Sequence, residues 1–108
     1  MKISGTVTDL PVLEDYEDAR DKSIAQGQPV KVAIGLKKPG KGRPTFFRIV
    51  FIDDVAETVM RQLAPGDVIT VTGDDASLRM VWEVDEISRQ SPVLRVNGIG
   101  WVMGAPKR

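Results

Sequence analysis

The sequence has no cysteine and no histidine among its 108 residues. Thiol nucleophiles, thiolate and imidazole metal ligands, imidazole general bases and disulfide bonds are therefore excluded. Aromatic residues are scarce, at 6% of the chain, and the apolar runs are only a few residues long. We accordingly expect neither a secretory signal nor a membrane span, and hence a cytoplasmic protein.

The remaining composition is typical of one small soluble domain. Apolar residues make up 42% of the chain, and 15 basic residues balance 15 acidic ones. A chain of this length buries about 65% of the surface that its unfolded form exposes, which is enough for one hydrophobic core. No repeat or linker divides the sequence, so we expect a single domain over residues 1–108.

The charges are segregated along the chain although they cancel in sum. The segment from Lys31 to Arg48 has no acidic residue, and its basic residues are Lys31, Lys37, Lys38, Lys41, Arg43 and Arg48. The segment from Asp9 to Asp21 has six acidic residues and a single arginine. The first segment suits an anionic ligand, whereas the second would repel one.

Alternating apolar and polar residues predict strands over residues 2–8, 30–37, 45–52, 68–72, 78–84 and 93–103. Residues 53–66 have apolar side chains at helical spacing instead, which predicts one short helix with Asp53 or Asp54 as its N-cap. The long acidic connection contains a candidate helical turn around residues 14–25. Residues 85–92 are expected to form the tip of the last hairpin.

This order of elements predicts an all-β fold with one short helix. A helix inserted between the third and fourth of five strands is the arrangement of the OB-fold, a five-stranded Greek-key barrel. Residues 104–108 are expected to form a short C-terminal extension to this domain.

Three segments of the sequence form one ordered pattern. They are the run from Phe46 to Ile52, Ala56-Glu57 on the predicted helix, and the run from Leu63 to Gly73. In this order and spacing they resemble the bacterial and phage single-stranded DNA-binding proteins, which have the OB-fold. Residues 5–11 fit the first strand of that family and residues 32–36 fit its second. The similarity extends over most of residues 3–103.

The resemblance implies roles for particular side chains. Phe46 stands where the family has a base-stacking aromatic, Arg48 falls on a strand arginine, and Trp82 lies near a stacking tryptophan. Ile52 replaces another usual aromatic, so one stacking platform is lost. The resemblance also implies dimers or tetramers. The sequence ends in the basic run Gly-Ala-Pro-Lys-Arg, where cellular members have an acidic tail that recruits replication proteins, so we do not expect recruitment through such a tail.

The residues of strand 45–52 support a binding surface independently of any family. Alternation puts Phe47, Ile49 and Phe51 on a core face, and Phe46, Arg48, Val50 and Ile52 on the other. The second face adjoins four residues of the preceding strand, Lys31, Ala33, Gly35 and Lys37. The small residues Ala33 and Gly35 are expected to leave room for bases. A π-surface and phosphate-neutralising cations are what single-strand binding needs. The interpretation depends on the Phe46 ring lying open beside these cations.

Each of these residues also has a plain structural explanation. Phe46 can belong to the core, Arg48 can be an ion-pair partner, and the lysine loop can be a solubilising hairpin tip. Trp82 is explained equally well by packing and by stacking. For Trp101 we favour packing or a subunit contact.

We therefore predict a non-catalytic protein that binds single-stranded DNA with little sequence preference, in replication, recombination or repair. RNA is an alternative ligand, because stacking tolerates both. The expected binding residues are Lys31, Lys37, Lys38, Lys41, Arg43, Phe46, Arg48, Ile52, Arg79 and Trp82. The location would be nucleoid-associated, or the host cytoplasm if the protein is phage-encoded.

No cofactor, metal or catalytic residue is expected. The adjacent pairs Asp53-Asp54 and Asp74-Asp75 diverge in direction. The phosphate-loop-like run from Gly35 to Lys41 has Gly42 where a Ser or Thr must bind Mg²⁺. The alternative function is that of an OB-fold adaptor in a replication or other assembly, with contacts from residues 9–21 and the edge at Trp101.

Overall fold

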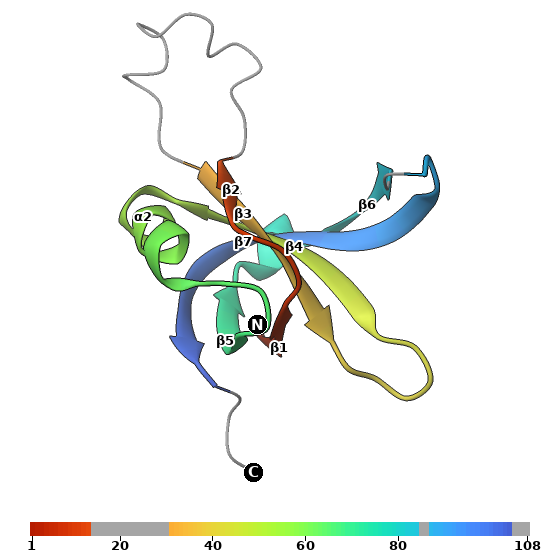
Figure 1. Ribbon diagram of the computed structural model, residues 1–108, viewed down its shortest axis with the longest axis horizontal. Helices are drawn as coiled ribbons and strands as arrows, with labels where there is room; N and C mark the ends of the chain where they lie inside the picture. The colour runs from red at the N-terminus through yellow and green to blue at the C-terminus, as the bar shows by residue number, and fades with distance from the viewer. Residues whose placement is uncertain (14–30, 85–86, 105–108) are drawn as a thin grey trace, which may run out of the picture.

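The computed structural model describes residues 1–13, 31–84 and 87–104, which form a β-barrel with one α-helix against it (Figure 1). The strands are β1 Lys2–Val7, β2 Val12–Leu13, β3 Lys31–Lys38, β4 Thr45–Ile52, β5 Val68–Gly73, β6 Arg79–Val84 and β7 Gln90–Met103. The helices are α2 Asp53–Gln62 and the short 3₁₀ helix η1 Asp75–Ser77. The helical turn expected around residues 14–25 lies outside the described residues.

Five strands close the barrel. β1 pairs with β5, β5 with β7, β7 with β4, β4 with β3, and β3 with β1 again. All these pairs are antiparallel except β4 with β7, which is parallel. Because α2 connects β4 to β5, it lies between the third and fourth barrel strands. The predicted OB-fold barrel with one short helix is confirmed.

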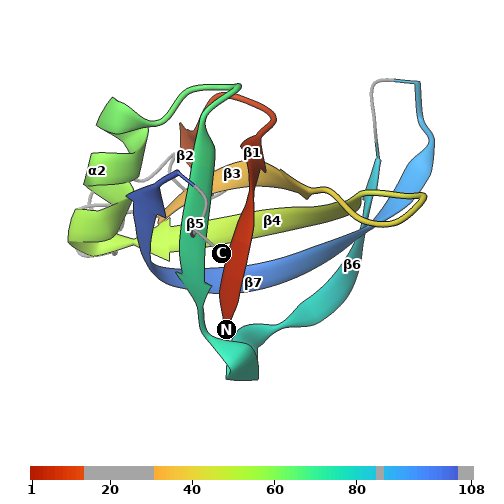
Figure 2. The ribbon, with the colours of Figure 1, turned by 90° about the horizontal axis from the view of Figure 1, so that it is seen from below.

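The core follows from strand alternation. Phe47, Ile49 and Phe51 are buried on the inner face of β4, as the sequence predicts. The α2 helix packs at one end of the barrel (Figure 2), where it buries Ala56 and Val59 against the same cluster. The apolar face of this short helix therefore completes a core that the strands alone leave open at that end.

Two local predictions are wrong. The N-cap of α2 is Ile52 rather than Asp53 or Asp54, and no side chain caps the helix. The strand β4 runs directly into α2, with Asp53 at a positive φ of 58°, so both carboxylates lie in the first turn. The hairpin tip is also shorter than residues 85–92, because β7 begins at Gln90 and continues the ladder opposite β6.

The strand β7 is shared by both sides of the barrel, because its first half pairs with β6 and β4 and its last part pairs with β5. Gly98 pairs with Gly73 at the register shift where β7 changes partners. A Cβ atom at Gly98 would lie 2.7 Å from Cδ1 of Phe51. Only a residue without a side chain lets β7 pass this close over the core.

Replacing Gly98 with alanine should therefore destabilise the barrel by about 1–3 kcal/mol, because the added methyl group overpacks the Phe51 ring. The matched control is Gly100→Ala in the same strand, where no heavy atom lies within 4 Å of the added Cβ. Urea unfolding of both variants measures the difference. Equal losses would mean that the contact with Phe51 does not constrain this strand.

Candidate nucleic-acid interface

We define the outer face as the side of β3, β4, β7 and β6 that points away from the core. Phe46 exposes its ring on this outer face. The residue is 45% exposed. Its cross-strand partner on β3 is Lys37, which is also exposed. Partners across a sheet share one face. The expectation that this ring lies open to solvent beside a cation is confirmed.

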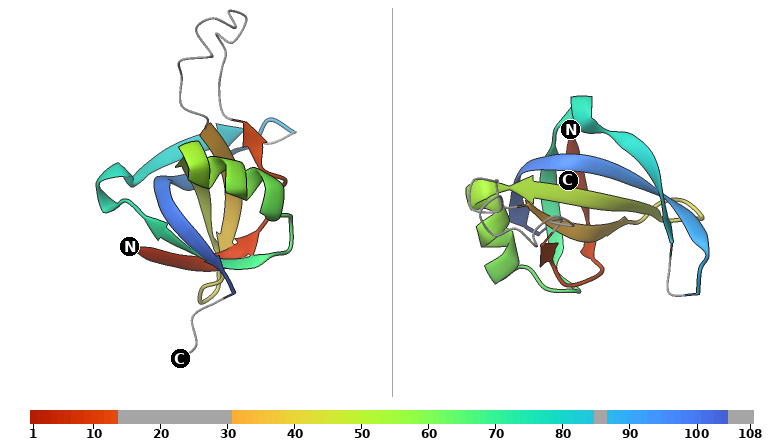
Figure 3. Two further views of the ribbon diagram at one scale, coloured as in Figure 1. Left: turned by 90° about the vertical axis from the view of Figure 1, so that its left-hand side faces the viewer. Right: turned by 90° about the horizontal axis from the view of Figure 1, so that it is seen from above.

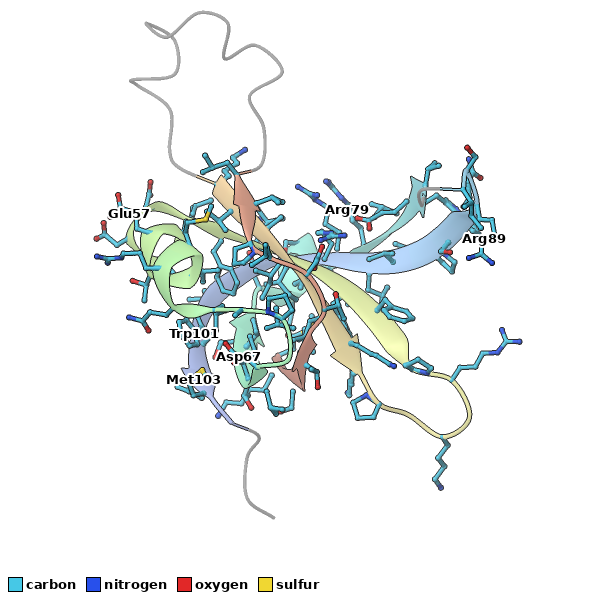
Figure 4. All side chains as sticks on the ribbon, viewed as in Figure 1. Glu57, Asp67, Arg79, Arg89, Trp101 and Met103 are labelled. Atoms are coloured by element: carbon cyan, nitrogen blue, oxygen red, sulfur yellow. The ribbon has the colours of Figure 1, made fainter. Side chains whose placement is uncertain are left out.

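Three arginines form a row across the outer face. Arg48 on β4 pairs with Arg95 on β7, and Arg95 pairs with Arg79 on β6. All three lie on the same face because each is the register partner of the next. Figure 4 shows Arg79 at the start of β6, where the β6–β7 hairpin leaves the barrel. We call these residues the arginine row.

Arg48 is held by two carboxylates from distant parts of the chain. Its Nε and Nη2 atoms donate to Glu83 Oε2 and Oε1 at 3.0 and 2.9 Å, which makes a bidentate pair. Its Nη1 atom donates to Asp9 Oδ2 at 3.1 Å. The other oxygen of Asp9 accepts from the backbone N–H of Gly35 at 2.8 Å. Arg48 thus ties β6 to the segment that follows β1, and the ion-pair alternative describes its contacts in the structure.

These contacts keep the guanidinium charged. The hydrogen bonds to Glu83 raise the pKa of Arg48 above its ordinary value, against the lowering effect of burial, and those to Asp9 add to the rise. A raised pKa stabilises the fold at every pH below the ordinary arginine value, and this contribution is lost only as the pH rises through the raised value. Arg48 therefore remains a cation throughout the neutral range.

The small residues of β3 are largely covered by the segment after β1, although Gly35 and Ala33 each border one of the two hollows described below. A Cβ atom at Gly35 would collide with Thr8 Oγ1 and Asp9 Oδ1. Ala33, two residues away, pairs with Val12 of β2, and both small residues are buried. The segment after β1 fills the space, because the carboxylate of Asp9 accepts the Gly35 N–H at close range.

Two open hollows flank the pair formed by Arg48 and Glu83. The first has a volume of about 340 Å³, and besides this pair it is lined by Thr8, Gly35, Phe46, Phe47, Val84, Ser91 and Val93. The second has a volume of about 510 Å³, and its other lining residues are Asp9, Val12, Leu13, Ala33, Val84 and Arg95. The ion pair therefore stands between the hollow beside Phe46 and the hollow beside Arg95.

The other predicted cations are spread along the β3–β4 pair. The hairpin between these strands extends from the end of the barrel near Phe46 (Figure 1), and its exposed basic residues are Lys38, Lys41 and Arg43. Lys31 and Ile52 are cross-strand partners at the opposite end of the pair. Six residues of strand separate Lys31 from Lys37, which is about 20 Å. The structure therefore groups the hairpin cations with Phe46 and leaves Lys31 and Ile52 apart.

Trp82 lies on the opposite face of the sheet from Phe46. It pairs with Pro92, which shares a face with Leu94, and Leu94 pairs with the core residue Phe47. The β6–β7 hairpin extends beyond the barrel (Figures 2 and 3), so Trp82 is 59% exposed although it continues the inner face. The two aromatic residues therefore do not form one continuous stacking platform. Trp101, in contrast, packs against the core, as one of its two expected roles requires.

Sequence reasoning did not single out Asp9, Glu83 and Arg95 as members of this face. Alternation along residues 78–84 puts Glu83 on the same side as Arg79, and this signal was available. No local pattern predicts the parallel register that brings Arg95 beside Arg48. Asp9 is assigned to the acidic segment from the sequence alone. Its position beside β3 could not be predicted, because it depends on the path of the chain after β1.

Within residues 1–13, 31–84 and 87–104, no three metal-binding side chains gather closely enough to hold an ion. No helix in the described part of the chain is both long and apolar enough to cross a lipid bilayer.

Removing the guanidinium of Arg48 should lower the free energy of unfolding by about 1–2 kcal/mol, since its charged hydrogen bonds are partly screened by solvent. The variant Arg48→Gln is compared by urea unfolding with Arg43→Gln, which changes an exposed hairpin arginine. We expect Arg43→Gln to unfold like the wild-type protein. A similarly small effect of both changes would contradict a structural role for the Arg48 contacts.

Two solved structures are similar to this chain in fold. The SSB domain of a Synechococcus sp. protein matches with a TM-score of 0.62 and 16% identity, over 94% of this chain and 90% of that chain. The small single-stranded DNA-binding protein from Streptomyces coelicolor matches with a TM-score of 0.60 and 19% identity, over 96% and 92%. No family model and no curated protein matches the sequence. The chain therefore shares the OB-fold barrel of these structures along nearly its whole length.

Proposed function

We propose that this protein binds single-stranded DNA, without catalysis and with little sequence preference, through the outer face around Phe46. The observation that carries the proposal is the exposed aromatic ring directly beside Lys37, with a hollow next to it. A base gains about 1–3 kcal/mol by stacking on such a ring, and every base has a π-face. The fold supports the proposal, since both similar structures are named for single-stranded DNA binding or as an SSB domain.

The phosphates of the bound strand would be neutralised mainly by the hairpin next to Phe46. Lys37 lies beside the ring, and the other exposed cations at this end are Lys38, Lys41 and Arg43. A DNA strand that continues along β3 and β4 would meet Lys31 and Ile52 about 20 Å from Lys37. Arg79, at the start of β6, would contact the DNA strand farther along its path. Trp82 would stack on a base where the DNA strand turns around the edge of the β6–β7 hairpin.

The biological setting is part of the same proposal. A protein that covers exposed single strands acts in replication, recombination or repair, in the cytoplasm of a cell or of a phage-infected host. We further propose that the chain forms homo-oligomers, because among residues 1–13, 31–84 and 87–104 the strand β6 pairs with β7 alone, which leaves one sheet edge for another copy. RNA is the second candidate ligand, since stacking does not distinguish it from DNA.

Titration with oligo(dT), followed by tryptophan fluorescence, tests the proposal. Neutralising three to five phosphates predicts that the logarithm of the affinity falls with the logarithm of the salt concentration at a slope of roughly −2 to −4. The same titration with oligo(U) measures the preference for DNA over RNA. Absence of binding at low salt, or binding that salt does not weaken, would contradict the proposed function.

The stacking role of Phe46 is tested by substitution. Phe46→Ala should weaken oligo(dT) binding by about tenfold, which corresponds to the loss of one stacked base. Phe46→Tyr keeps an aromatic ring and should bind like the wild-type protein. Ile99→Ala removes an exposed apolar side chain elsewhere on β7 and serves as the control for general surface effects. Equal affinities of all three variants would remove Phe46 from the binding site.

A further inference from the structure

The arginine nearest to Phe46 on its strand is already occupied by carboxylates of the same chain. Glu83 accepts two hydrogen bonds from the guanidinium in the fork geometry that a phosphate would also use. Asp9 accepts from the remaining nitrogen. Three of the five N–H groups of Arg48 thus have internal acceptors, and both N–H groups of the fork are among them, so a phosphate can take this fork only by replacing the Glu83 carboxylate.

The position of the pair makes this replacement relevant to a bound strand. Arg48 and Glu83 border both hollows, so a DNA strand that passes from the hollow beside Phe46 to the hollow beside Arg95 crosses the pair. The carboxylates also repel phosphates there. Their side chains are 33% and 47% exposed for Glu83 and Asp9 respectively, so both are within reach of an incoming anion.

The two carboxylates differ in how firmly they are held. Asp9 Oδ1 accepts from the Gly35 N–H at 2.8 Å and from Thr8 Oγ1 at 3.1 Å, so Asp9 has backbone and side-chain partners besides Arg48. Glu83 lies on β6, which within the described part of the chain pairs only with β7, and its carboxylate accepts two hydrogen bonds from Arg48. Glu83 is therefore the acceptor that can leave with less disturbance of the barrel.

Resting on the proposed single-strand binding, we propose that Glu83 and, to a smaller extent, Asp9 are internal competitors of the nucleic-acid phosphates. They hold Arg48 away from the ligand and set the affinity below what the cations of the outer face would otherwise provide. On binding, a phosphate of the strand takes the place of the Glu83 carboxylate on Arg48. No covalent bond changes, and the exchange is one of ion pairs.

The test compares two variants that each remove one negative charge. Glu83→Gln frees Arg48, whereas Glu57→Gln changes an exposed carboxylate on α2, away from Arg79 and the outer face (Figure 4). Relative to Glu57→Gln, we expect Glu83→Gln to bind oligo(dT) about three- to tenfold more tightly at 0.1 M salt. Its salt slope should become steeper by about 0.7, the value for one additional phosphate contact with a single strand.

A second variant keeps the test decisive if Glu83→Gln does not unfold cooperatively. Asp9→Asn retains an oxygen that can accept from Gly35, loses the charge that faces Arg48, and should raise the affinity about twofold over Glu57→Gln. If the wild-type protein binds and the tested variant matches Glu57→Gln in affinity and salt slope, the inference is wrong and the proposed function stands. If neither wild-type nor variant binds at low salt, the proposed function fails as well.

Discussion

The close passage of β7 over the Phe51 ring at Gly98 is the constraint on which the barrel depends. At this point β7 leaves β4 and turns to pair with β5, so a single strand of 14 residues joins both sides of the barrel. A side chain at Gly98 would push β7 away from the core. The hydrophobic core and the closure of the sheet are therefore set by the same contact.

The arrangement of the outer face follows from the same strand. The first half of β7 lies between β4 and β6, so it carries Arg95 into line with Arg48 and Arg79. Three aligned guanidinium groups would repel one another, and carboxylates from β6 and from the segment after β1 compensate the charge of Arg48. The fold thus brings acidic residues onto the face that the linear charge distribution marks as basic.

This compensation reconciles a chain of zero net charge with the proposed binding of a polyanion. In the proposed function, the exposed hairpin cations and the Phe46 ring supply the attraction and the stacking surface. Glu83 and Asp9 would counteract that attraction at Arg48. The balance between the two would then set the strength of the proposed binding, and salt would act on both because both are partly exposed to solvent.

Local patterns in the sequence predict the barrel strands, the short helix and the division of β4 into a core face and an outer face, because alternation and helical spacing depend on neighbouring residues. They therefore place Phe46 correctly on the outside. Three features come from the assembled fold instead: Arg48 meets Glu83, 35 residues away, Asp9 fills the space over Gly35, and Trp82 lies on the opposite face from Phe46. These contacts depend on strand register and on the path of the chain between strands, and both are set by the packing of segments distant in sequence.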